Sequence, residues 1–313
     1  MPELRCGAHR SIAERGENLL DALNRAGQRI PFSCRAGSCQ VCKVRCIEGE
    51  PIDLLPDALD AVQRREGWRL ACQCHVDGDL HVEPFSPERD GQPACVEQAE
   101  WLAGEVLRLR LSTASPVRYR PGQHAALWTP SGLARRYSMA SVPGEESGLE
   151  FHIDCSRPGA FASHARTLSA GDRLLVADMQ GGPLAYEPEW DDQPLLLLGG
   201  GTGLAPLWSV ARYALAKGQV GPIRLVHVAR DDYLREPMMA LAASHPSLSV
   251  EWLDRSGLDH LLAQERRVPR RTIALVCGSE GFVEACVRGL YLAGLPRNQV
   301  RAECFVSGSG TGA

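Results

Sequence analysis

The chain has 313 residues, of which 44% are hydrophobic, and a formal net charge of −4 at pH 7. This length suits two or three globular domains, and the slightly acidic charge argues against a nucleic-acid-binding protein. The uninterrupted apolar runs are short, as at Leu195–Leu198, so the sequence predicts no segment that spans a membrane.

The first segment, residues 1–90, predicts a small domain with one helix and a sheet. Apolar residues recur near helical spacing at Leu19, Leu23, Ala26 and Ile30. Val41–Glu48 and Leu80–Glu83 have the composition of strands. Residues 84–93 are polar and rich in proline, which predicts a linker to the next domain.

Four cysteines in this segment have the spacing of iron–sulfur ligands. Three form a C-x4-C-x2-C loop and the fourth follows later in the chain: Cys34, Cys39, Cys42 and Cys72. This is the ligand pattern of a plant-type [2Fe–2S] cluster. Gly37 lets the loop backbone approach the sulfides. Ser38 and the loop N–H groups are expected to donate hydrogen bonds to sulfur, which tunes the reduction potential.

Disulfides and zinc are the alternative uses of these cysteines. The chain has twelve cysteines, but no signal peptide precedes them, so a reducing cytoplasm is expected. Zinc could bind Cys39 and Cys42, but Cys72 and Cys74 stand too close together for the usual second pair. Cys46 and Cys74 are therefore predicted not to be ligands. Small core residues are expected at Cys6, Cys95, Cys155, Cys286 and Cys304.

The second segment, residues 93–190, is rich in strands. In Val106–Leu111 leucines alternate with arginines, so the leucines are expected to face a core and the arginines water. A turn at residues 121–123 leads into the next strand. The further strands are His124–Trp128, Leu149–Cys155 and Arg173–Ala177. Regular strands separated by turn signals predict an antiparallel barrel.

The third segment, residues 194–313, follows a second joint at 187–194 and alternates strands with helices. The expected strands are Leu195–Leu198, Ile223–Val228, Ile273–Cys277 and Val300–Phe305. The expected helices are Leu204–Ala216, Leu234–Ser244 and Phe282–Ala293. This alternation predicts βαβ units and a parallel sheet.

Three short motifs in these segments are candidates for binding sites. Arg135-Arg136-Tyr137-Ser138 follows a turn, and by themselves these residues could be unrelated surface groups. The glycine-rich loop 199–203 joins a strand to a helix, where backbone donors can reach a pyrophosphate, although many such loops are only tight turns. Val276-Cys277-Gly278 ends a strand, and there a buried core thiol is the alternative explanation.

In order, the three segments resemble the NADH-dependent reductase components of bacterial multicomponent oxygenases of the ring-hydroxylating dioxygenase type. The sequences CRAGSC and LACQC resemble a plant-type ferredoxin domain, RRYS resembles the FAD-binding barrel of the ferredoxin–NADP reductase superfamily, and GGTGLAP its NAD(P) domain. The resemblance implies a β-grasp domain (1–90), an antiparallel β-barrel FAD domain (93–190) and a Rossmann-like α/β NAD domain (194–313). The departures from the family are Gln40, Ala160 and Ser279.

On the flavin side, the resemblance assigns roles to three residues of the RRYS motif. Arg135 would pair with the pyrophosphate, Tyr137 would pack against the flavin, and Ser138 would hydrogen-bond near N5, where hydride arrives. Arg136 occupies a variable position and receives no role. FMN is the alternative flavin, but relatives that use FMN carry their ferredoxin domain at the opposite end of the chain.

A second flavin element is implied further along the barrel. His152 and Ile153 would lie on a strand beside the ring. A turn that contains Gly159 and Ser163 would bind phosphate at the start of a helix.

On the nicotinamide side, the resemblance assigns the pyrophosphate loop to Gly200, Gly201, Thr202 and Gly203. Cys277 and Gly278 would form the turn at the nicotinamide, with Cys277 and Ser138 as the catalytic residues, and Phe305 would cover the other flavin face. Arg230 and Asp232 would meet the adenosine ribose. The acids there favour NADH over NADPH, although they could simply begin a helix.

The implied function is electron transfer from NADH through FAD and the [2Fe–2S] cluster. The acceptor would be an oxygenase component or its Rieske-type ferredoxin, in aromatic hydrocarbon catabolism. A reductase of the same fold could instead serve a deoxysugar-forming dehydratase or a diiron monooxygenase. An alternative of another class is a redox-sensing binding module, which steady NADH turnover with a one-electron acceptor would distinguish from the enzyme.

Overall fold

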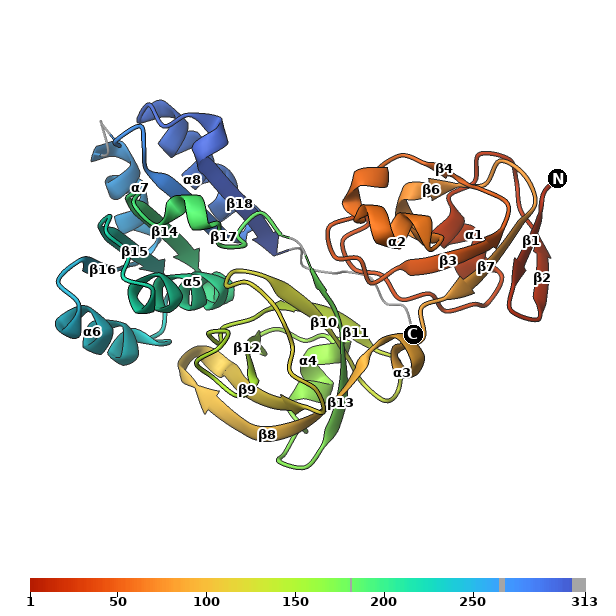
Figure 1. The fold of residues 1–313 in the computed structure, drawn as a ribbon, viewed down its shortest axis with the longest axis horizontal. Helices are drawn as coiled ribbons and strands as arrows, with labels where there is room; N and C mark the ends of the chain where they lie inside the picture. Colours follow the sequence, from red (N-terminus) through yellow and green to blue (C-terminus); the bar gives the residue numbers. More distant parts are fainter. Residues whose placement is uncertain (181, 265–267, 306–313) are drawn as a thin grey trace.

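The computed structural model describes residues 1–180, 182–264 and 268–305. Three sheets follow one another along the chain, and Figure 1 shows the first and third parts on opposite sides of a central barrel. No helix within these ranges is long and apolar enough to cross a membrane. The predicted fold class, with a β-grasp-like part, an antiparallel barrel and a parallel α/β part, is confirmed.

The first part is a mixed sheet with the strand order β2-β1-β7-β3-β5, in which β1 and β7 are parallel. A two-stranded sheet, β4-β6, lies beside it. The elements are β1 (Glu3–Cys6), β2 (His9–Ile12), α1 (Leu19–Arg25), β3 (Lys43–Glu48), β4 (Ile52–Asp53), α2 (Ala61–Arg65), β5 (Trp68–Leu70), β6 (Cys74–His75) and β7 (Leu80–Pro84).

Helix α1 is shorter than the apolar pattern predicts. It begins at the Asn18 side chain, which caps the first turn, and ends before Gly27, whose φ is +82°. Ile30 is buried but lies beyond the helix. Its amide donates to the Asn24 side chain (2.6 Å). A positive φ ends the helix because an α-helix requires a negative one, and the apolar spacing alone did not show this.

The second part is an antiparallel sheet with the strand order β11-β10-β13-β8-β9-β12. A bridge between Met139 and Phe151 joins its two edges into a barrel. In β9 the leucines are buried, while the side chains of Arg108 and Arg110 are partly exposed, as the alternation predicts. The strands are β8 (Gln92–Leu102), β9 (Val106–Thr113), β10 (His124–Trp128), β11 (Ala134–Ser138), β12 (Leu149–Asp154) and β13 (Arg173–Gln180), with α4 (Ala160–Ala165).

The predicted linker at 84–93 is partly structured. It contains the short helix α3 (Pro87–Asp90), and β8 already begins at Gln92. Proline fits the first turn of a helix because its missing N–H would have no partner there. The connection between the first two parts is therefore compact.

The third part is a parallel sheet with the order β16-β15-β14-β17-β18. Its strands are β14 (Leu195–Gly200), β15 (Ile223–Val228), β16 (Leu248–Leu253), β17 (Ile273–Ser279) and β18 (Val300–Phe305). Its helices are α5 (Leu204–Ala216), α6 (Arg235–Ser244), α7 (Arg255–Gln264) and α8 (Glu280–Leu292). The sequence did not predict β16 and α7, because β16 is an edge strand of mixed polarity and α7 is largely polar.

Short 3₁₀ turns complete the described elements. They are η1 (Pro56–Ala58), η2 (Ala71–Gln73), η3 (Ala103–Glu105), η4 (Pro188–Trp190), η5 (Gly201–Gly203) and η6 (Arg297–Gln299). The turn η4 lies in the predicted joint at 187–194, and its Trp190 is buried in the core of the third part.

The first part packs on the barrel through a small apolar contact. Cys39 and Val41 of the cysteine loop share one buried cluster with barrel residues, namely Ala126, Trp128, Ala134 and Ala177. Phe85 stacks on Trp128, with ring centroids 5.5 Å apart. The cysteine loop is therefore held against the β10–β11 edge of the barrel.

Candidate functional site

The four predicted cluster ligands come together as two pairs. The thiols of Cys34 and Cys39 hydrogen-bond to each other, and those of Cys42 and Cys72 do the same. The shared proton lowers the pKa of Cys34 to about 4 and that of Cys72 to about 7, and raises the pKa of each partner. Among the residues that the structure describes, no three His, Cys, Asp or Glu side chains gather as around one metal ion. Two pairs of thiols fit two irons, each with two protein ligands.

The loop directs hydrogen-bond donors at the sulfur atoms, as the sequence predicts. The amides of Ala36 and Cys39 each donate to the Cys34 sulfur (3.3 Å), and Ser38 adds a side-chain hydrogen bond. Gln73 Nε2 donates to the Cys72 sulfur (3.4 Å). Such donors stabilise thiolate and sulfide charge and so raise the reduction potential of a bound cluster.

Gly37 is required by the loop geometry. Its φ is +76°, and a Cβ atom at this position would lie 2.8 Å from the Leu55 side chain. Cys46 and Cys74 lie on β3 and β6, outside the two pairs. Burial raises the pKa of Cys46 to about 11 and that of Cys74 further.

A cavity of about 480 Å³ opens where the three parts of the chain meet. Residues from each part line it: Ser33, Cys34 and Cys39 from the cysteine loop, Arg135, Tyr137, Ser138, His152 and Gly159 from the barrel, and Thr202, Ala205 and Phe305 from the third part. The cavity thus brings together residues that the sequence assigned to three separate sites.

The barrel wall of the cavity fits a flat aromatic ligand with a polar edge. The Ser138 hydroxyl is buried and has no hydrogen-bond partner among the described residues. Buried hydroxyls are normally satisfied, so this one indicates a ligand atom. Tyr137 packs on Phe161 with ring centroids 5.2 Å apart. Arg135 donates to the Ala134 carbonyl (2.9 Å) and lines the same cavity.

The second predicted flavin element is only partly at the cavity. Gly159 lines it at the start of α4. Ser163 does not, and its amide already donates to the Gly159 carbonyl (2.8 Å). Ile153 is fully buried in the barrel core, so its side chain faces away from the cavity.

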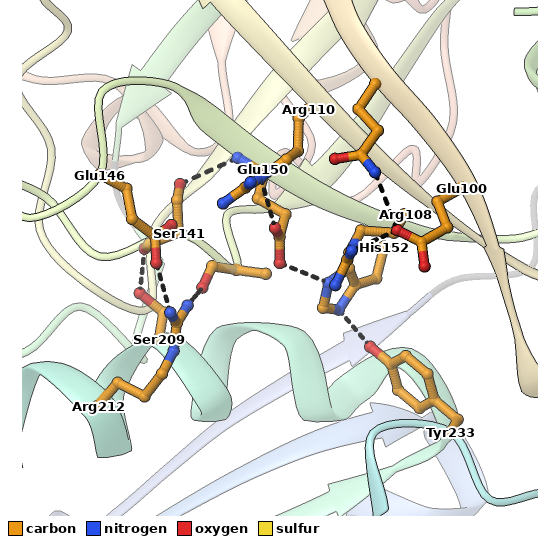
Figure 2. Close-up of polar contacts among 12 residues, drawn as sticks. Glu100, Arg108, Arg110, Ser141, Glu146, Glu150, His152, Ser209, Arg212 and Tyr233 are labelled. Atoms are coloured by element: carbon orange, nitrogen blue, oxygen red, sulfur yellow. Dashed lines mark hydrogen bonds and ion pairs between the residues drawn. The ribbon is translucent and has the colours of Figure 1, made fainter. Parts of the chain in front are cut away.

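His152 lines the cavity but directs both ring nitrogens at protein partners. Figure 2 shows Nε2 against Glu150 (2.9 Å) and Nδ1 against the Tyr233 hydroxyl of the third part. Glu150 also pairs with Arg110 (3.1 Å). Burial lowers the pKa of His152, although the Glu150 carboxylate opposes this. His152 therefore lines the cavity and joins the barrel to the third part of the chain.

A second polar contact in Figure 2 supports the same interface. Arg212 of α5 donates to the Ala140 carbonyl and pairs with Glu146 of the barrel. Ser209 of α5 donates to the Ser141 carbonyl (2.6 Å). These contacts hold helix α5, which follows the glycine loop, at a fixed position over the barrel.

The glycine loop and Cys277 meet at the carboxyl edge of the parallel sheet. Gly199 is the strand partner of Cys277, and a Cβ atom on Gly203 would lie 2.1 Å from the Cys277 carbonyl oxygen. Burial raises the pKa of the Cys277 thiol well above its usual range, so the thiol stays protonated. Gly278 packs against Phe282, where a Cβ atom would come within 2.7 Å of the ring. Open parallel sheets bind nucleotides at this edge.

Of the predicted nucleotide residues, Thr202 alone is among those that line the cavity itself, and Phe305, predicted to cover the flavin, lines it as well. Gly200, Gly201 and Gly203 form the adjoining turn. The predicted ribose residues lie farther away and are exposed. Asp232 pairs with Arg235 (3.0 Å), Asp231 faces Gly104 of the barrel, and Arg230 precedes them.

The sequence missed Arg136 and Glu303. Arg136 donates to the Ser38 carbonyl of the cysteine loop (2.5 Å) and pairs with Glu303 of β18 (3.2 Å). Burial raises the pKa of Glu303, and Arg136 partly offsets this. An acid inside a mostly apolar C-terminal strand was a signal for Glu303. Arg136 gave no signal, because its partners are remote in the sequence.

Comparisons with known proteins agree with this organisation. A family model described as a 2Fe-2S iron-sulfur cluster binding domain matches residues 5–77, and an oxidoreductase NAD-binding domain matches residues 197–288. The chain is 31% identical to the reductase component (ferredoxin–NAD(P)+) of the naphthalene 1,2-dioxygenase system of Pseudomonas putida, over 94% of each chain. It is 35% identical to the reductase subunit of an aromatic O-demethylase of Amycolatopsis sp., over 77% of this chain and 76% of the relative.

Two solved structures share the fold over nearly the whole chain. The Amycolatopsis cytochrome P450 reductase has a TM-score of 0.65 at 29% identity and covers 97% of this chain and 99% of its own. The ferredoxin reductase in carbazole 1,9a-dioxygenase has a TM-score of 0.64 at 24% identity, covers 97% and 98%, and shows the fold alone. This chain therefore belongs to the family of ferredoxin–NAD(P)+ reductases that are the reductase components of oxygenase systems.

Proposed function

We propose that this protein is an NADH-dependent reductase that passes electrons through FAD and a [2Fe–2S] cluster to an oxygenase component or its ferredoxin. The observation that carries the proposal is the single cavity of about 480 Å³ lined by the cysteine loop, the RRYS strand and the third part of the chain. Electron transfer between two cofactors requires that they lie close together. A cavity wall that includes Cys34 and Cys39 supports this arrangement.

The proposed domains are 1–90 for the cluster, 93–190 for FAD and 194–313 for NAD. When bound, the flavin accepts two electrons as a hydride and releases them singly, and the cluster provides a one-electron exit. Cys34, Cys39, Cys42 and Cys72 are the proposed cluster ligands. The donors Ala36, Ser38 and Gln73 stabilise charge on the cluster sulfur atoms.

The barrel residues bind and orient the flavin in this proposal. Arg135 is the cation for the pyrophosphate, with the Gly159 backbone beside it. The Ser138 hydroxyl, which has no partner among the described residues, donates to the reacting edge of the ring. Tyr137 and His152 form the walls. Burial lowers the pKa of His152 and so favours its neutral form, and Glu150 and Tyr233 hold its two nitrogens in place.

The third part binds and orients NADH. Gly200–Gly203 and the start of α5 offer backbone donors to the pyrophosphate. Cys277 lies under Gly203 and, as a protonated thiol, packs near the nicotinamide without adding charge. Phe305 covers the other flavin face and helps to exclude water. Arg230 and Asp232 are proposed to face the adenosine ribose.

We propose a cytoplasmic location, because all twelve cysteines are free thiols and a cluster of this kind needs reduced ligands. The acceptor is proposed to be an oxygenase component or its Rieske-type ferredoxin, since relatives at 31% and 35% identity are reductases of a dioxygenase system and of an O-demethylase.

A visible absorption spectrum before and after NADH tests the function. The purified protein should show flavin and iron–sulfur bands, in a ratio of one FAD to two irons, and both should bleach when NADH is added without oxygen. Protein that contains zinc, or that binds flavin and cluster but is not reduced by NADH, would contradict the proposal.

A further inference from the structure

One side chain, Arg136, joins all three parts of the chain. It lies on β11 of the barrel, and its side chain is 13% exposed. One guanidinium nitrogen donates to the carbonyl of Ser38 (2.5 Å), and the other lies 3.2 Å from the carboxylate of Glu303 on β18. A planar guanidinium can hold two acceptors at a fixed angle, which a flexible ammonium cannot do.

The position of each partner gives this contact its significance. Ser38 precedes the cluster ligand Cys39, so its carbonyl belongs to the loop that would surround the cluster. Glu303 is the strand partner of Cys277, at the carboxyl edge of the nucleotide-binding sheet. Arg136 thus connects the cluster loop to the sheet edge that faces the same cavity.

The buried carboxylate makes the clamp strong. The Glu303 side chain is 5% exposed, and neither of its oxygens accepts a hydrogen bond from a described residue, so its contact with Arg136 is an ion pair alone. His124 lies 3.8 Å away but is neutral, because burial and the Arg136 charge lower its pKa to about 3. The ion pair with Arg136 favours the charged form of Glu303, which burial disfavours, and removing one partner of a buried pair is costly.

The interface that Arg136 reinforces includes an apolar cluster. The first part rests on the barrel through Cys39, Val41, Phe85 and small barrel residues such as Ala126 and Ala134. Domains joined by small interfaces move relative to one another unless they are held. A charge-assisted hydrogen bond to the loop backbone fixes both distance and orientation at this interface.

We propose that Arg136 is a positioning residue for flavin-to-cluster electron transfer, which clamps the cluster loop to the barrel and to Glu303. This inference rests on the proposed function. It concerns the exit of electrons rather than their entry, so hydride transfer from NADH is affected much less than reduction of an acceptor that takes electrons from the cluster. Arg136 lines the same cavity as Arg135, but flavin binding is assigned to Arg135 and the proposed role of Arg136 is to position the cluster loop.

The test compares the holoenzyme with Arg136→Ala and Arg136→Lys. NADH-driven reduction of ferricyanide reports the flavin, and reduction of cytochrome c reports the cluster exit. Misplacement by about 1 Å can slow a step by roughly 10²-fold, so the ratio of cytochrome c to ferricyanide activity should fall at least tenfold in Arg136→Ala. Arg136→Lys should restore part of the ratio, since it keeps the charge but cannot hold both acceptors.

Small-angle scattering of the same holoenzymes gives a readout independent of activity. Arg136→Ala should increase the radius of gyration as the first domain undocks, with flavin and iron content unchanged. Arg10→Ala removes an exposed ion pair with Glu3 in the same domain and serves as the matched control, with no change expected. An unchanged activity ratio, an unchanged radius or a parallel loss of both activities would overturn the clamp. The wild-type spectrum with NADH tests the proposed function separately.

Discussion

The proposed cluster site and the proposed nicotinamide site differ in how they would bind a cofactor. At the cluster the four proposed ligands are side chains, and three of them belong to one loop, Cys34–Cys42. At the nicotinamide site the proposed contacts come from the backbone, and residues such as Gly203 have no side chain. Side-chain ligands such as the cysteines can therefore be proposed from their spacing in the sequence. A site built from backbone groups depends instead on how closely two strands and a helix approach each other.

The largest effect is expected where a side chain is itself a ligand. Cys72→Ser should remove most of the iron and cluster absorbance, because Cys72 and Cys42 are proposed to ligate one of the two irons. Cys46→Ser and Cys74→Ser, outside the two pairs, should keep the cluster. Iron and visible absorbance of the three purified variants decide this. Equal iron loss in all three would contradict the ligand set.

The backbone site should fail when one methyl group is added. Gly203→Ala would place a Cβ atom 2.1 Å from the Cys277 carbonyl oxygen, so the loop must move. A displacement of this size should lower kcat/KM for NADH by about 10²-fold, with the cluster spectrum intact. Gly281→Ala is the control, because a Cβ atom there meets nothing within 4 Å. Similar losses in both variants would show that the collision is not the cause.

The proposed flavin site combines side-chain and backbone contacts, and Arg135 is the cation proposed for the pyrophosphate. Arg135→Ala should weaken FAD binding by about 1.5–3 kcal/mol, the value of a hydrogen bond to a charged group. Arg136→Ala should change FAD affinity little, because Ser38 and Glu303 occupy its guanidinium. Titration of the apoflavoproteins with FAD measures both. Equal weakening would mean that the assignment of the two arginines is wrong.

The nucleotide-binding part should lose stability in acid. Burial lowers the pKa of His227 to about 4, and the ring contacts the Gly201 carbonyl (3.0 Å). Between pH 6.5 and 4 the unfolded chain binds the proton that the folded protein excludes, so stability falls as pH falls through this window. At pH 5 the loss is about 2 kcal/mol.

Urea unfolding at pH 7 and pH 5 measures this loss. His227→Gln, which does not titrate, should show a smaller difference between the two pH values. An equal difference in the variant and the wild type would assign the acid sensitivity to other groups.

The smallest expected effect concerns the choice of coenzyme. NADH should have a higher kcat/KM than NADPH, because Asp231 and Asp232 repel a 2′-phosphate. Both acids are exposed, and Asp232 pairs with Arg235. Interactions between exposed charges contribute up to about 1 kcal/mol. Asp231→Ala or Asp232→Ala should therefore lower the ratio of kcat/KM for NADH to that for NADPH only a few-fold. A wild-type preference for NADPH would overturn the assignment.

Local patterns in the sequence determined most elements. The spacing of Cys34, Cys39 and Cys42 was sufficient to propose them as cluster ligands, because a short loop leaves its side chains few other arrangements. The bounds of β10, β15 and α5 were predicted as they occur, since periodicity is a property of neighbouring residues. The end of α1 was not, because it depends on one positive φ at Gly27.

The tertiary structure alone decided which distant residues share the cavity. His152 contacts Tyr233, which lies 81 positions away in the chain, and Arg136 contacts Ser38, which lies 98 positions away. No local pattern in the sequence predicts either contact. The sequence placed three cofactor-binding segments in order along the chain. That the cysteine loop, the RRYS strand and Phe305 line one cavity follows from how three hydrophobic cores pack against each other, and such packing is a property of surfaces rather than of sequence spacing.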